Sequence, residues 1–191
     1  MARLQLVNHE TASEETKAVL DQVKKKMGGV PNIIGTLANS PAAAKGYLAF
    51  SAALAAGSFS AQTREAIALT VGQANECDYC LAAHTQLGKG AGLTEAQTLD
   101  ARRSTSQDPK TDAVLKFARR IVDARANVSD ADVEEVRTAG VSDAEIAEIV
   151  GLVSLNIYTN YFNHVAGTEV DFPAAPELTS CCSTANSSSC C

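Results

Sequence analysis

Helix-start signals recur along almost the whole of this chain, and no segment alternates between apolar and polar residues as a half-buried strand does. Ser40-Pro41 places a capping residue before a proline, which suits the first turn of a helix. Ser142-Asp-Ala-Glu145 has the serine-to-glutamate spacing of a capping box. Between such starts, apolar residues recur every three or four positions. The pattern predicts an all-α fold.

The starts and stops divide the chain into a series of helices and a tail. The expected helices cover residues 12–27, 41–56, 61–75 and 77–88, then begin at 94, 109 and 129, with a last one over 143–164. With 191 residues, of which 46% are hydrophobic, the chain can bury one good core. We therefore expect one multi-helix domain over residues 1–172. Residues 173–191 are rich in Ser and Cys, cannot bury much apolar surface, and are expected to form a disordered tail.

Charge and hydropathy exclude several classes of protein. The net charge is -6, which disfavours a nucleic-acid binder because such proteins usually present a basic face. No apolar run approaches the ~18–20 residues of a membrane span, and the N-terminus lacks the apolar centre of a secretory signal. We expect a cytoplasmic protein. In that compartment a Cys-x-x-Cys pair is usually catalytic or metal-binding.

One motif combines a dithiol with an imidazole and a carboxylate. Cys77, Cys80 and His84 are spaced i, i+3, i+7, so they share one face of a helix that starts near Cys77. A helix N-terminus favours a thiolate, and a second thiol nearby allows a disulfide to form. Glu65 lies on the preceding helix and can orient or reprotonate His84 if the two helices pack antiparallel. The motif predicts redox chemistry.

Roles without redox chemistry stay open for these cysteines. The two thiols could be buried structural residues, although the Asp-Tyr pair between them fits core packing poorly. A structural zinc site needs four ligands, and the motif offers three.

The paired cysteines near the C-terminus could bind a soft metal ion, exchange electrons with the motif, or have no role. They are Cys181, Cys182, Cys190 and Cys191.

The motif resembles that of the alkylhydroperoxidase D-like branch of the carboxymuconolactone decarboxylase family. The similarity extends over residues 5–173 and includes several further segments. These are Gly29-Val-Pro-Asn32, Thr63-Arg-Glu65, Gly88-Lys-Gly-Ala-Gly-Leu-Thr94, Asn160-Tyr-Phe-Asn-His164 and Asp171-Phe-Pro173.

The resemblance implies an all-helical bundle that assembles into dimers, trimers or hexamers and reduces hydroperoxides with its thiols. No cofactor is bound; an external dithiol, such as a lipoyl group on a carrier protein, resets the disulfide, and a peroxiredoxin can receive the electrons. Cys80 then attacks the peroxide, Cys77 resolves the product, and Glu65 with His84 relays protons. The two cysteine roles could be reversed, because the sequence does not show which sulfur is exposed.

Three further residues are candidates for the substrate pocket. Tyr79 stands where active family members can carry a histidine, and tyrosine is a poor base at neutral pH. Asn160 and His164 share one side of the last predicted helix with Asn163, and this side could line a pocket above the dithiol, although His164 could equally form a hydrogen bond near the helix C-terminus. The alternative activity is that of a decarboxylase-like lyase acting on a small lactone acid. Arg64 is the only cation near the motif that could hold such a substrate.

Overall fold

A computed structural model describes residues 2–178, and this part of the chain contains nine helices and no strand. The all-α prediction is confirmed. The helices are α1 (Glu14–Met27), α2 (Asn32–Leu37), α3 (Pro41–Ala55), α4 (Ala61–Ala74), α5 (Asp78–Gly90), α6 (Glu95–Arg102), α7 (Pro109–Asp123), α8 (Asp130–Thr138) and α9 (Asp143–Ala166). The short α2 was not predicted. It has no side-chain cap, because Pro31 stands at its N-cap position.

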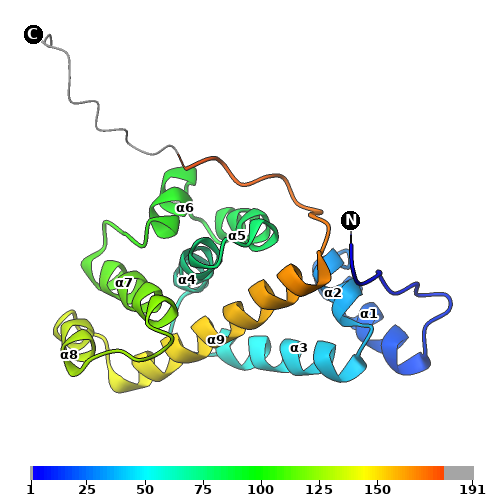
Figure 1. The fold of residues 1–191 in the computed structure, drawn as a ribbon, viewed down its shortest axis with the longest axis horizontal. Helices are drawn as coiled ribbons and strands as arrows, with labels where there is room; N and C mark the ends of the chain where they lie inside the picture. Colours follow the sequence, from blue (N-terminus) through cyan, green and yellow to red (C-terminus); the bar gives the residue numbers. More distant parts are fainter. Residues whose placement is uncertain (1, 179–191) are drawn as a thin grey trace, which may run out of the picture.

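Helix α4 forms the centre of the fold (Figure 1). Seven consecutive residues, 66–72, are buried, so this helix is covered on all sides. Its Ser60 side chain caps the first turn by accepting from the Thr63 backbone N–H. A helix that is apolar around its whole circumference belongs in a core. Here α5, α6, α7 and α9 supply the cover.

Helices α4 and α5 pack antiparallel at close range. A Cβ atom on Gly72, near the end of α4, would lie 3.5 Å from Cys80, near the start of α5. At the other end, a Cβ on Gly88 would lie 3.6 Å from Glu65 Cβ. The two glycines let the helix backbones approach, and this packing brings the predicted motif together.

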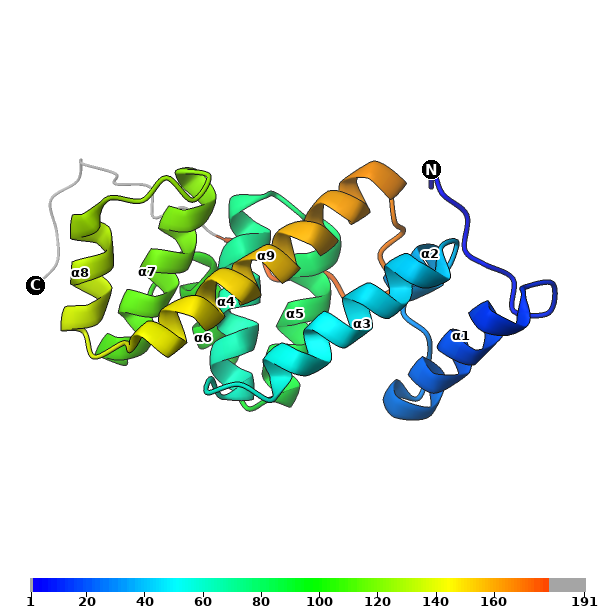
Figure 2. The same cartoon turned by 90° about the horizontal axis from the view of Figure 1, so that it is seen from below.

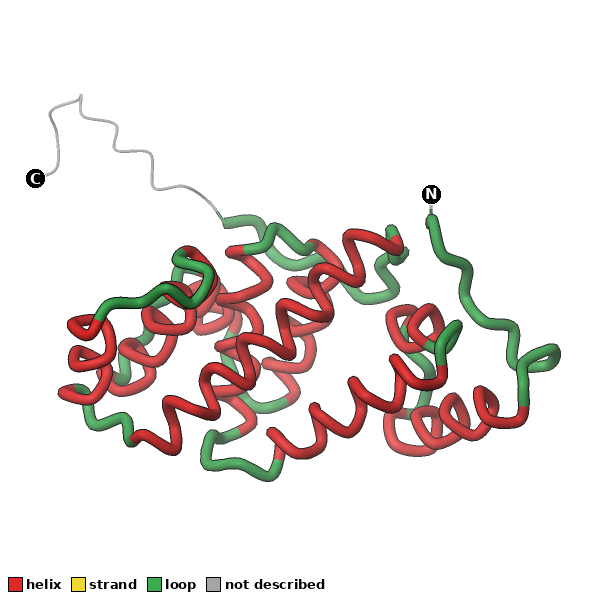
Figure 3. Tube along the Cα trace, turned by 60° about the horizontal axis from the view of Figure 1, so that its bottom comes forward, coloured by secondary structure: helices red, strands yellow, loops and turns green. Residues whose placement is uncertain are grey.

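Helix α9 crosses the molecule diagonally and connects its two ends (Figure 2). It passes α4 and α5, with α3 beside it, while α1 and α2 lie at one end and α7 and α8 at the other. The segment after α9, residues 167–178, then turns back over α5 toward α6 (Figures 1 and 3). We call it the return segment. No helix among the described residues is long and apolar enough to cross a membrane.

The surface of α3 is unusually apolar. Of its residues only Ala44 is buried, although the helix is made mainly of alanine and includes Leu48, Phe50 and Leu54. Phe50 is 41% exposed. The predicted assembly of several copies stays a prediction.

Part of the return segment packs against the domain. Ala175 lies against the main core, and the buried Arg102 side chain donates a hydrogen bond to the Pro176 carbonyl. The packed chain therefore extends past Phe172, where the sequence placed the start of the tail. Residues 179–191, which include both C-terminal cysteine pairs, lie outside the described residues.

These contacts predict a measurable difference between two shortened chains. A chain ending at Phe172 should be less stable than one ending at Leu178 by about 1–3 kcal/mol, since it loses the hydrogen bond to a charged guanidinium. Urea unfolding followed by circular dichroism measures both. Equal midpoints and equal slopes would show that the return segment beyond Phe172 adds nothing to stability.

Candidate active site

The dithiol is carried by a tight turn between α4 and α5. Asn75 is the C-cap of α4, Glu76 has a φ of 54°, and Cys77 is the N-cap of α5. A positive φ is unfavourable for a residue with a side chain. The turn is fastened to α9: Asn75 Nδ2 donates to Asn160 Oδ1 at 2.9 Å, and His164 Nε2 lies 2.8 Å from the Asn75 carbonyl. These contacts hold the strained turn in place.

The two sulfur atoms are in contact and almost fully enclosed. Cys77 Sγ and Cys80 Sγ are 2.8 Å apart, which is a hydrogen-bonded pair of free thiols. Cys77 is 2% and Cys80 3% exposed. The Asn163 side chain reaches them from α9, with its Nδ2 atom 3.3 Å from Cys80 Sγ and 3.9 Å from Cys77 Sγ. This amide can therefore donate to whichever sulfur carries charge.

The hydrogen bond between the two thiols shifts their pKa values in opposite directions. The Cys80 thiol, by donating to the Cys77 sulfur, lowers the pKa of Cys77 to about 7, although burial opposes this. The Cys80 backbone N–H, the charge of His164 and the Asn163 amide act in the same direction. The pKa of Cys80 is raised, first by the hydrogen bond to Cys77 and then by burial. The pair thus gives up one proton near neutrality and holds the other.

Glu65 and His84 form the second part of the site. Glu65 Oε2 lies 2.7 Å from His84 Nδ1, and both side chains are about four-fifths buried. Burial lowers the pKa of His84, but the charge and hydrogen bond of Glu65 outweigh it, so the pKa is raised. The Cys77 charge adds to this rise. His84 can therefore hold a proton close to the thiolate.

A cavity of about 170 Å³ adjoins this pair. It lies among α3, α4, α5 and α9, and its lining includes Tyr47, Arg64, Glu65 and His84. Tyr47 also packs against the apolar cluster that contains both sulfurs. Burial raises the pKa of Tyr47 to about 12, with smaller contributions from the Cys80 and Glu65 charges. Tyr47 therefore contacts both the cavity and the cluster that contains the dithiol.

Tyr79 points away from this cavity and fastens the return segment. Its hydroxyl donates to Asp171 Oδ1 at 2.8 Å and accepts from the Ile33 backbone N–H at 3.2 Å. Asp171 Oδ2 accepts from the Asn32 backbone N–H at 2.8 Å, and Phe172 packs edge-on against the Tyr79 ring. Burial raises the pKa of Tyr79, so the phenol stays neutral and can donate. We call these contacts the Tyr79 latch.

The predicted site residues therefore have different contacts in the structure, and these contacts indicate different roles. Cys77 pairs with Cys80 and Glu65 pairs with His84, and the charge of Cys77 acts on His84. Asn160 reaches the dithiol turn, whereas the exposed His164 binds a backbone carbonyl, and Tyr79 belongs to the latch. Asn163, expected on the same side of the last helix as Asn160, reaches both sulfurs. One contributor, Tyr47, was missed, because nothing in the sequence of the α3 segment singles it out.

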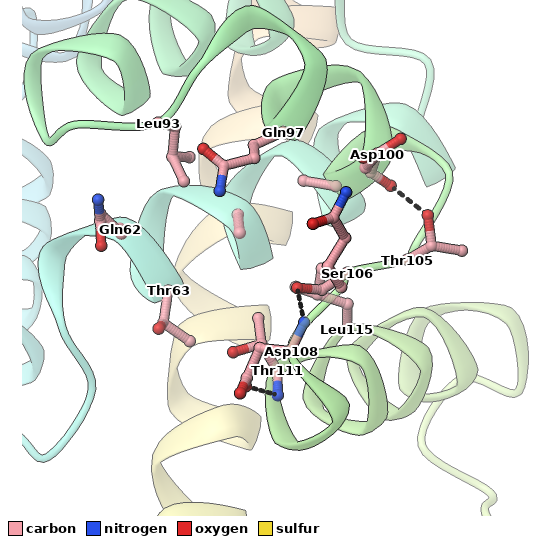
Figure 4. A pocket seen from close by; sticks show the side chains of 13 residues that line it. Gln62, Thr63, Leu93, Gln97, Asp100, Thr105, Ser106, Asp108, Thr111 and Leu115 are labelled. Carbon is pink, nitrogen blue, oxygen red and sulfur yellow. Dashed lines mark hydrogen bonds between the residues drawn. The ribbon is translucent and has the colours of Figure 1, made fainter.

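A larger cavity lies elsewhere (Figure 4). It has a volume of about 380 Å³ and lies among α4, α6 and the start of α7, with Gln62, Gln97 and Thr105 in its lining. It contains neither a cysteine nor a histidine. Within residues 2–178, no group of three His, Cys, Asp or Glu side chains is placed to hold a metal ion.

Comparison with known proteins shows relatives of the same fold. Residues 41–124, from α3 to just after α7, match the model of the carboxymuconolactone decarboxylase family. A search of curated proteins gave no match. Among solved structures, the alkylhydroperoxidase AhpD core of a peroxidase-related protein from Ralstonia eutropha JMP134 is 24% identical. The match has a TM-score of 0.76 and covers 89% of this chain and 92% of the other.

Two other solved structures have the same fold. A peroxidase-related protein from Silicibacter sp. TM1040 is 24% identical, with a TM-score of 0.69 and coverage of 87% and 89% of the two chains. The debrominase Bmp8, in complex with 2,3,4-tribromopyrrole, is 17% identical, with a TM-score of 0.76 and coverage of 90% and 92%. Residues 41–124 are thus similar to the carboxymuconolactone decarboxylase family, and the chain shares its fold with the alkylhydroperoxidase AhpD core.

Proposed function

We propose that the protein is a thiol-dependent peroxidase that reduces hydroperoxides through Cys77 and Cys80. The observation that carries this proposal is the enclosed pair of sulfurs, 2.8 Å apart, beside the Glu65–His84 acid. A structural pair of cysteines would not need a pKa of about 7 at Cys77. A thiolate together with a protonated imidazole supplies the nucleophile and the acid that cleavage of a peroxide bond requires.

The proposed reaction has two steps. A cysteine thiolate attacks the terminal oxygen of R–O–O–H, forming an S–O bond and breaking the O–O bond, and the alkoxide R–O⁻ takes a proton from His84. The resulting sulfenic acid then reacts with the second thiol, giving the disulfide and water. The two sulfurs together supply the two electrons that the peroxide accepts.

The lowered pKa supports Cys77 as the attacking sulfur, with Cys80 resolving the sulfenic acid. This order is the reverse of the one that the family resemblance implies. It follows from the thiolate being the nucleophile, so the sulfur that ionises first reacts first. We also propose that an external dithiol, such as a lipoyl group on a carrier protein, reduces the disulfide by thiol–disulfide exchange.

The activity is tested by peroxide consumption with several reductants, among them dihydrolipoamide. We expect turnover with a dithiol, and after one equivalent of peroxide a loss of two hydrogens from the peptide that contains Cys77 and Cys80. Mass spectrometry of the alkylated protein measures this loss. Both thiols remaining free after peroxide treatment would overturn the proposal. 2,3,4-Tribromopyrrole, the ligand of Bmp8, should be included as a second electron acceptor.

A lyase reaction on a small lactone acid is the second candidate, because Arg64 lines the cavity beside Glu65 and His84. The Arg64 guanidinium donates to the Phe59 carbonyl, which leaves it only partly available for a carboxylate. Such a lyase would not use the thiols. Lactone turnover that survives in the Cys77→Ser, Cys80→Ser double variant would therefore favour this activity over the peroxidase.

A further inference from the structure

Two buried polar atoms near the sulfurs have no partner. Asn160 is fully buried and Asn163 is 5% exposed, and both lie on the face of α9 that meets the dithiol turn. Asn160 uses its Oδ1 atom to bind Asn75, and Asn163 uses its Nδ2 atom to bind the sulfurs. This leaves the Nδ2 atom of Asn160 and the Oδ1 atom of Asn163 without a hydrogen bond.

Such atoms are costly to bury. A buried amide group without a partner costs ~1–3 kcal/mol, so most of them in folded proteins are satisfied. Here one free donor and one free acceptor lie a single helical turn apart, beside a reactive sulfur pair. Asn160 is near enough to Cys80 for its amide to favour the Cys80 thiolate, acting against the rise in pKa. The two atoms therefore lie where a reacting molecule must come.

We propose that Asn160 and Asn163 form the binding site for the peroxide group of a hydroperoxide. The inference rests on the proposed function and specifies how its substrate is held. The O–O–H group offers one hydrogen to donate and oxygen lone pairs to accept, which matches one free C=O and one free N–H group. The Asn163 Oδ1 atom accepts the hydroperoxide O–H, and the Asn160 Nδ2 atom donates to a peroxide oxygen.

This pairing selects one chemical class. A disulfide or a dialkyl peroxide has no O–H group, so it would leave the Asn163 oxygen unsatisfied. A hydroperoxide satisfies both amides and remains beside the sulfur that attacks it. The site recognises only the peroxide group, so it sets no requirement on the organic group of the hydroperoxide.

The test compares two oxidants that start from the same thiolate. The rate of dithiol oxidation by cumene hydroperoxide is divided by the rate with 2,2′-dithiodipyridine, a disulfide that accepts the same two electrons, leaves as two 2-thiopyridone molecules and has no O–H group. The ratio cancels any change in the thiolate population. Asn160→Leu and Asn163→Leu should each lower the ratio by ~10-fold or more, since each removes one bond to the substrate.

A matched control variant tests whether the effect on the ratio depends on the position of the asparagine beside the sulfurs. Asn39→Leu makes the same change at an exposed asparagine, whose side chain donates to the Gln5 and Thr36 carbonyls rather than to a sulfur, so its ratio should equal that of the wild type. Circular dichroism checks that each variant folds. If Asn160→Leu does not fold, Asn163→Leu alone decides the question.

Each outcome has a distinct meaning. An unchanged ratio in a folded Asn163→Leu protein overturns the binding site while leaving the peroxidase proposal in place. A wild type that reacts with 2,2′-dithiodipyridine but not with any hydroperoxide overturns the peroxidase proposal itself, and the binding site with it. A lower ratio in both Asn160→Leu and Asn163→Leu, with a wild-type ratio in Asn39→Leu, supports the site.

Discussion

Replacing either cysteine of the pair by serine should abolish turnover of hydroperoxides. Serine cannot form the disulfide, so the cycle stops after at most one reaction per protein molecule. The remaining thiol in Cys80→Ser is Cys77, whose pKa of about 7 owes most to the hydrogen bond from residue 80. Because the serine hydroxyl can still donate that bond, Cys77 should be oxidised once and stay as a sulfenic acid.

A sulfenic-acid trap measures this difference between the single variants. Labelling by dimedone after one equivalent of peroxide should be fast in Cys80→Ser and slow in Cys77→Ser, where the remaining thiol is the more basic one. The opposite order would assign the attack to Cys80, as the family resemblance implies. Undiminished steady-state turnover in either variant would remove the dithiol from the mechanism.

The Glu65→Gln variant should lose about 10²–10⁴-fold in the rate of thiol oxidation by peroxide, the usual contribution of a positioned acid or base. The wild-type rate should rise as the pH increases through about 7, where Cys77 ionises, and fall as the pH passes the raised pKa of His84. Glutamine removes the charge that raises this pKa, and burial then lowers it. The rate therefore begins to fall at a lower pH than in the wild type, so few molecules hold both a Cys77 thiolate and a protonated His84.

Stopped-flow oxidation between pH 5 and pH 9 would show this change of profile. Glu95→Gln is a suitable control. Glu95 lies on α6 and pairs with Lys89, which is on the same helix as His84, and the Glu95 side chain is well exposed. It should keep the wild-type rate and profile. Identical profiles for Glu65→Gln and the wild type would leave Glu65 without a role in proton transfer.

Local signals were enough to predict most of the fold. The serine and threonine caps, the proline at the first turn of α3 and α7, and the capping boxes of α6, α8 and α9 act within a few residues, so they can be read directly from the sequence. The short α2 has no such cap and depends on its neighbours. The Glu65–His84 contact was predictable because two adjacent helices joined by a short turn pack antiparallel.

Contacts between distant segments were not predictable in this way. The Tyr79 latch joins α2, α5 and the return segment, and sequence separations of 46 and 92 residues lie between its hydrogen-bonded partners. For this reason Tyr79 could be taken for a pocket residue when only its place between the cysteines was considered. Tyr47 reaches the site from α3, for which the motif gives no signal. These residues owe their positions to tertiary packing.

The enclosure of the sulfurs also governs the timing of the reaction. With 2% and 3% of Cys77 and Cys80 exposed, a molecule larger than water reaches them only in the fraction of molecules in which the cover has opened. The observed rate is then the product of that fraction and the rate in the open form. A small oxidant needs only a brief, narrow opening, whereas a reductant on a carrier protein needs a wide one. The two halves of the cycle therefore depend on different fluctuations of one fold, and the less frequent fluctuation sets the speed of the whole cycle.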